Sequence, residues 1–225
     1  MDALTPTPLS KIRRHPERGD YDRATVYAIL DAGLLCHVGY ALGDQPLVTP
    51  TLYWRDGDRL YWHGSAASRM IRTLATGVKA CLTVALVDGL VLARSAFTHS
   101  MNYRSVMAFG TATLIESEAE KLAALEALIE RLYPGRWREL RAPTAGEIKA
   151  TAVMSMAIEE ASAKIRSGAP LDRDFDLAAP VWAGVIPLSL QAGAPVRDER
   201  LDPEIEVPDC VKRFSLTGAN PKTSS

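Results

Sequence analysis

The stretch HGSAASR, residues 63–69, ends an apolar strand pattern and begins a helical one. The first N–H groups of such a helix have no partner within it and carry the positive end of the helix dipole, so they can bind an anion. Ser65 and Ser68 add hydroxyl donors, and Arg69 adds a guanidinium suited to phosphate. The stretch therefore indicates a phosphate site between a strand and a helix.

The same residues allow a plainer interpretation. Ser65 can cap the helix while Arg69 faces solvent, and spacing alone does not decide between the two. The stretch lacks the Gly-Lys-Ser/Thr element of a P-loop, and the chain has no G-x-G-x-x-G fingerprint. A Rossmann dinucleotide site is therefore not expected.

Working outward, short turns separate a series of apolar runs. We expect strands over 34–40, 47–54, 59–63, 78–87, 90–93, 103–115, 152–158 and 181–188, with Asp88-Gly89 as a turn between two of them. Pro50 implies a strand edge or a place where the ladder opens. Short turns between many strands favour a mainly β (α+β) fold, an antiparallel barrel with peripheral helices, over a parallel sheet.

Three helices have recognisable starts. Asp22 precedes a short helical pattern that Gly33 ends. Ser117 and Thr144 each stand three residues before a glutamate, which is the spacing of a capping box. We therefore divide the chain into an N-terminal extension (1–22), a barrel domain (23–190) and a C-terminal tail (191–225) that is partly disordered from residue 219.

The composition limits the classes of binding partner that we expect. Lysine plus arginine number 26 and aspartate plus glutamate 27, so the formal charge is -1. This balance gives no reason to expect nucleic acid or a membrane surface as a partner. Cys36, Cys81 and Cys210 lack metal-type spacing, and no signal-peptide pattern follows the first residues. We expect a cytoplasmic protein.

Residues 93–104, ARSAFTHSMNYR, place several polar side chains between two apolar runs. Such a loop can contact a ligand at the mouth of a barrel, or it can be an ordinary surface loop. His37 lies in an apolar run and is expected to be structural. The four histidines show no ligand spacing, so no metal site is expected.

Several segments in order resemble the FMN-binding proteins related to pyridoxamine 5′-phosphate oxidase, in the branch with the nitroimidazole-resistance flavoproteins. The resemblance covers about residues 13 to 190. The matching segments are Arg18-Gly-Asp-Tyr-Asp-Arg, Ile29-Leu-Asp-Ala-Gly, Cys36-His-Val-Gly, Tyr61-Trp-His-Gly-Ser-Ala-Ala-Ser-Arg, Asp88-Gly-Leu-Val-Leu-Ala-Arg-Ser, Asn102-Tyr-Arg-Ser-Val and Val181-Trp-Ala-Gly.

The resemblance implies a split β-barrel of about six strands that forms a homodimer, with FMN at the subunit interface. The residues that it assigns to FMN are Val48, Thr49, Pro50, Thr51, Trp62, His63, Ser65, Ser68, Arg69 and Ser105. A second set, with weaker support, is Asn102, Tyr103, Arg104, Lys164 and Trp182. The tail after residue 190 does not match the segment with which the oxidase grips its substrate, which argues against pyridoxamine phosphate oxidation.

Three functions remain open. The first is an FMN-dependent oxidoreductase that acts on a small molecule with NAD(P)H or a similar reductant, with His63 and His99 as candidates for proton handling. The second is a flavin carrier or sensor without turnover. The third is a different ligand, haem or a deazaflavin, in the same groove.

Overall fold

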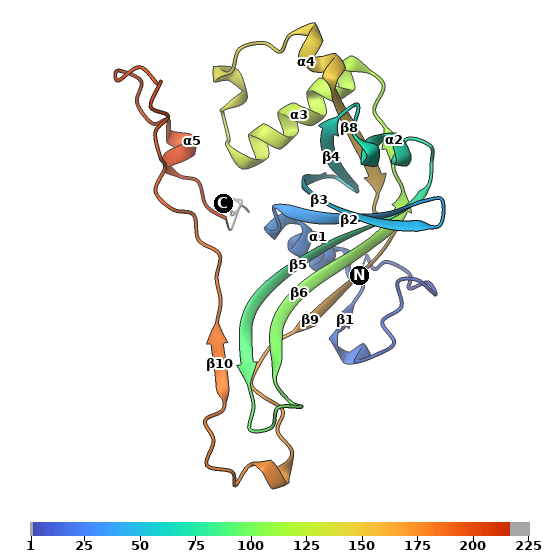
Figure 1. Ribbon diagram of the computed structural model, residues 1–225, viewed down its shortest axis with the longest axis vertical. Helices are drawn as coiled ribbons and strands as arrows, with labels where there is room; N and C mark the ends of the chain where they lie inside the picture. Colours follow the sequence, from blue (N-terminus) through green and yellow to red (C-terminus); the bar gives the residue numbers. More distant parts are fainter. Residues whose placement is uncertain (1, 217–225) are drawn as a thin grey trace.

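The computed structural model describes residues 2–216, and Figure 1 shows their arrangement. The strands are β1 (Gly19–Asp20), β2 (Leu35–Leu42), β3 (Gln45–Asp56), β4 (Arg59–Ser65), β5 (Lys79–Leu92), β6 (Ser100–Thr111), β7 (Thr113–Leu114), β8 (Thr151–Ala157), β9 (Glu160–Arg166) and β10 (Gly184–Pro187). The helices are α1 (Arg23–Ala32), α2 (Arg69–Leu74), α3 (Glu118–Leu132), α4 (Ala145–Ala150) and α5 (Asp209–Lys212), with short 3-10 turns η1 (Pro16–Arg18), η2 (Trp137–Glu139) and η3 (Asp174–Asp176).

The strands form one antiparallel sheet in the order β1-β9-β6-β5-β2-β3-β4-β8-β7, and β10 pairs with β5. Strand β7, the last in this order, follows β6 in the chain after the single residue Ala112 and pairs with β8. Because β6 lies near the other end of the order, this connection brings the two ends of the sheet together. The sheet is thus rolled into a barrel. The expected mainly β fold with peripheral helices is confirmed, although the strands are more numerous than expected.

Alternation along the strands separates two cores. Trp62 on β4 and Met154 on β8 point into the barrel, and both are fully buried there. Trp54 on β3 and Val153 on β8 point outward and pack with Leu128 of α3 in a second cluster. Figure 1 shows α3 and α4 over this end of the sheet, while β5, β6 and β9 extend as a long curved ribbon to the other end.

The expected helix starts are confirmed. The Asp22 carboxylate accepts a hydrogen bond from the Thr25 N–H at 3.2 Å, and Gly33 caps the other end of α1. The Ser117 hydroxyl accepts from the Glu120 N–H, and Thr144 forms a reciprocal capping box with Glu147. These signals are local in the sequence, which is why the pattern alone locates them.

Three strand predictions are corrected. Asp88-Gly89 is not a turn, because β5 continues through it with a bulge between Val87 and Gly89. Residues 160–166, expected to follow a strand, form β9 between β6 and β1. Strand β10 is shorter than the expected 181–188.

Within the described residues, the C-terminal segment from residue 191 contains the short helix α5. The expected disorder from residue 219 lies outside the described residues. Within residues 2–216, no helix combines the length and apolar character needed to cross a bilayer.

Candidate cofactor sites

The turn at residues 63–69 is built as a helix cap. The Ser68 hydroxyl accepts a hydrogen bond from the Ile71 N–H at 3.2 Å at the start of α2. The Ser65 hydroxyl accepts from the Ala67 N–H at 3.3 Å, and Arg69 is exposed with no ion-pair partner among the described residues. This geometry matches the plainer interpretation, and phosphate binding at Ser65, Ser68 and Arg69 stays a prediction.

Strand β3 has an open edge at the residues assigned to a flavin ring. Residues 45–52 pair with β2, but β3 pairs with β4 only from Tyr53 to Asp56. Val48, Thr49, Pro50 and Thr51 therefore lie on a strand whose second edge has no strand partner. Pro50 lies on this open edge, where the missing N–H of a proline costs no ladder bond to β4, and Val48 is 66% exposed.

Trp62 and His63 are neighbours on β4 but face opposite sides of the sheet. The Trp62 side chain is fully buried in the barrel core, so in this conformation a ligand could reach only its backbone. The assignment of Trp62 to FMN stays a prediction, and in this conformation the contact would be made through the backbone. His63 instead faces α3 and lines a large cavity.

That cavity has a volume of about 880 Å³, which is within the ordinary range for small-molecule sites. Its walls are mainly apolar and come from β3, α3, η2 and the residues around α4. They include Leu52, Leu122, Leu125, Leu128, Ile129, Leu132, Trp137 and Ile148, with Arg141 also among the lining residues. We call this space the α3 cavity.

His63 is the polar group that makes the α3 cavity chemically notable. Its Nδ1 atom is buried and has no hydrogen-bond partner among the described residues. Burial lowers the pKa of His63, because the charged imidazolium loses its hydration. Burial thus favours the neutral form of the ring, which is the form that binds metal ions. Sequence reasoning singled out His63 but not the cavity.

His99, the other candidate for proton handling, is exposed in the loop between β5 and β6. Its Nδ1 lies 2.9 Å from the Ser95 carbonyl oxygen. Figure 1 places this loop at the far end of the ribbon from β4, so the structure does not bring His99 and His63 together. His37 lies exposed on the outer face of β2, so the expectation of a structural histidine is wrong.

Three of the remaining assigned residues, Ser105, Arg104 and Asn102, have side-chain partners of their own. Ser105 donates to the Lys164 carbonyl at 3.2 Å. Arg104 forms a two-pronged ion pair with Asp88 at 2.7 and 2.9 Å. Asn102 is buried and bonds Arg166. Trp182 is 67% exposed ahead of β10, and Tyr103 is partly exposed.

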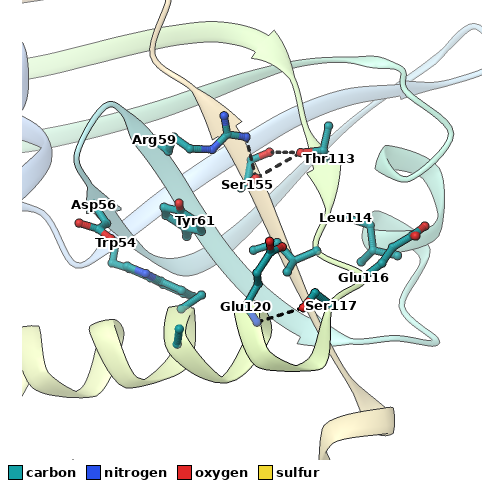
Figure 2. A pocket seen from close by; sticks show the side chains of 13 residues that line it. Trp54, Asp56, Arg59, Tyr61, Thr113, Leu114, Glu116, Ser117, Glu120 and Ser155 are labelled. Atoms are coloured by element: carbon teal, nitrogen blue, oxygen red, sulfur yellow. Dashed lines mark hydrogen bonds between the residues drawn. The ribbon is translucent and has the colours of Figure 1, made fainter.

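A second, more polar groove lies on the other side of Trp54. Figure 2 shows this groove, of about 600 Å³, between α3 and β4, β7 and β8. Within it Arg59 donates to the buried Ser155 hydroxyl at 2.8 Å, and Trp54 stacks on Tyr61 with ring centroids 5.6 Å apart. Trp54 therefore separates this groove from His63.

The rolled antiparallel sheet, with its open β3 edge, defines a split-barrel protein. The chain belongs to the pyridoxamine 5′-phosphate oxidase family, whose model matches residues 22–165. This confirms the family resemblance drawn from the sequence segments. A comparison with curated proteins gives no match.

Solved structures extend the likeness over almost the whole chain. The flavocytochrome Anf3 from Azotobacter vinelandii is 47% identical, with a TM-score of 0.90 over 94% of this chain and 98% of that one. The FAD and heme binding protein from Mycobacterium smegmatis is 37% identical, with a TM-score of 0.84 over 88% and 98%. A 5-nitroimidazole antibiotic resistance protein from Bacteroides thetaiotaomicron is 25% identical, with a TM-score of 0.53 over 64% and 84%.

Proposed function

We propose that the protein is a redox protein that binds a flavin and a haem and works as an oxidoreductase. The observation that carries the proposal is the unpartnered imidazole of His63 in the apolar α3 cavity. The names of two similar structures, a flavocytochrome and a FAD and heme binding protein, support this pairing of cofactors.

The α3 cavity fits a haem in its chemistry. A porphyrin is a large apolar ring that needs an enclosing apolar wall, and its iron needs an axial ligand, commonly a neutral histidine. The leucines of α3 supply the wall and His63 supplies the ligand, while Arg141 in the lining is ion-paired with Glu147. Haem bound there would supply a one-electron redox centre.

The haem would be held without covalent bonds to the chain. The three cysteines, Cys36, Cys81 and Cys210, do not form the C-x-x-C-H motif that attaches c-type haem. The expectation of no metal site rested on the absence of several ligands at suitable spacing. A haem iron needs only one imidazole from the protein, so that argument does not apply to it.

The flavin belongs at the open edge of β3. Backbone groups of residues 48–51 that have no strand partner can bond the polar edge of an isoalloxazine ring, and the adjoining outer face of the sheet is apolar. FMN and FAD share this ring, so the edge serves either. We retain FMN as the minimal ligand, and the FAD named for one relative is the alternative.

The outer face of the sheet also supports a homodimer. Exposed apolar side chains occur on neighbouring strands of this face, among them Leu35, Val48 and Met107. Exposed apolar surface of this kind is typical of an interface between subunits. We propose that two copies meet there and enclose the flavin.

The test is the absorption spectrum of the purified protein, followed by extraction and identification of its cofactors. Flavin bands together with a Soret band support the proposal, and a colourless protein that takes up neither cofactor overturns it. Anaerobic addition of NADH or NADPH then separates an enzyme, whose flavin is bleached, from a carrier or sensor, whose flavin is not.

A further inference from the structure

A buried arginine at the end of β9 has no acidic partner. The Arg166 side chain belongs to a residue only 5% exposed, and its described hydrogen-bond acceptors are neutral. They are the Asn102 side-chain oxygen and the carbonyl oxygens of Gly168 and Ala169, the last two at 3.2 and 3.0 Å. The positive charge of Arg166 is therefore hydrogen-bonded but not neutralised.

Two more cations lie beside it. Lys164 precedes Arg166 on β9, and its ammonium group donates to the Arg14 carbonyl at 3.1 Å. Arg18 ends the η1 turn, next to the short strand β1 that pairs with β9. Burial lowers the pKa of Arg166, and the nearby charge of Arg18 lowers it further.

Within the described residues, few acidic side chains offset the positive charges of Arg166, Lys164 and Arg18. The one ion pair joins Arg18 to Glu17 at 3.7 Å, and the Glu17 side chain is 63% exposed. An exposed pair at this distance contributes little. Arg166 could serve only to clamp residues 167–170, but a clamp needs neither Arg18 nor Lys164 close to it. Placing like charges together around a buried one is unfavourable unless an anion joins them.

We propose that Arg166, Arg18 and Lys164 form a binding site for the diphosphate group of a nucleotide ligand. One arginine can donate hydrogen bonds to two phosphate oxygens at once. A group of three cations matches the charge of a diphosphate better than the charge of a single phosphate ester. The site lies beside residues already assigned to the cofactor, because Tyr103 and Ser105 are the ladder partners of Arg166 and Lys164. FAD and NAD(P)H carry a diphosphate, and FMN does not.

Inorganic pyrophosphate is the direct probe, because its binding requires neither flavin nor haem. The full chain without cofactors should bind pyrophosphate in calorimetry, and Arg18→Ala and Lys164→Gln should each weaken that binding at least tenfold. Arg200→Ala is the matched control, since Arg200 is an exposed arginine paired with Asp198 in the C-terminal segment. Sodium chloride at equal ionic strength corrects for screening.

Titrations with FAD, FMN and NADH identify the source of the diphosphate. If FAD supplies it, Arg18→Ala weakens FAD binding at least tenfold and leaves FMN binding within twofold. If NADH supplies it, the same variant weakens NADH alone. The proposal is overturned if wild-type protein does not bind pyrophosphate, if Arg18→Ala and Lys164→Gln bind it as wild type does, or if neither FAD nor NADH binding changes.

Discussion

The imidazole of His63 lies against the indole of Trp54, with ring centroids 6.2 Å apart and planes tilted by 51°. Trp54 is 1% exposed and stacks on Tyr61 on its other side. The residue proposed to bind haem iron is thus held against a fluorescent side chain that solvent does not reach.

This contact predicts that haem quenches Trp54. Adding haem to protein freed of cofactors should reduce tryptophan fluorescence in a saturable way, because the indole would lie beside a strongly absorbing ring. Trp54 reaches the α3 cavity through its contact with His63, Trp137 lines the cavity directly, and Trp182 lies exposed near β10. Trp54→Phe should therefore remove much of the quenched signal, and Trp182→Phe should not. Equal quenching in both variants would place haem elsewhere.

Gly33 is predicted to be required for packing rather than for backbone freedom. Its φ of -88° suits any residue, but an added Cβ would lie 2.6 Å from the Tyr53 hydroxyl and 2.7 Å from a Val84 methyl. Gly33→Ala should lower the free energy of unfolding by about 1–3 kcal/mol through overpacking. Chemical denaturation measures this, with Gly193→Ala as control, since a Cβ at Gly193 meets nothing within 4 Å. Equal stability of the two variants would refute the packing argument.

The buried thiol of Cys36 leads us to expect that the protein loses stability at alkaline pH. Burial raises the pKa of its thiol from 9.0 to about 12. Between these values the unfolded chain releases the proton while the folded chain keeps it. The free energy of unfolding should therefore fall as pH rises, by up to about 1.4 kcal/mol per pH unit.

Denaturation of wild type and Cys36→Ala at several pH values from 9 to 11 isolates this effect, because every other titrating group is common to both proteins. The variant should show a shallower decline. Parallel declines would mean that the thiol ionises as easily in the folded protein as in the unfolded one.

The sequence predicted the parts of the fold that have local causes. The side chains of Asp22, Ser117 and Thr144 each cap a helix by accepting a hydrogen bond from the N–H three residues later. A few consecutive residues of sequence are therefore enough to identify these caps. The prediction of a turn at Asp88-Gly89 was wrong, because this dipeptide is typical of turns but here lies within β5. Hydrogen bonding of β5 to β6 and β10 keeps the strand continuous through it. The alternation of β9 is weak because it contains small residues, and its position depends on distant partners.

The candidate site shows the same division. The sequence indicated His63 as a candidate because it begins the motif that joins a strand to a helix. Pro50 correctly indicated an open edge on β3. The α3 cavity could not be predicted, because most of its walls come from residues 122–151, far along the chain from His63.

The most direct test of the central claim is the absorption spectrum of His63→Ala beside that of His99→Ala, each purified with flavin and haem supplied. His63→Ala should lose the Soret band and keep the flavin bands, because the proposed iron ligand is gone and the β3 edge is intact. His99→Ala should keep both, since His99 is exposed in the loop between β5 and β6. A Soret band of full height and unchanged position in His63→Ala would contradict the account.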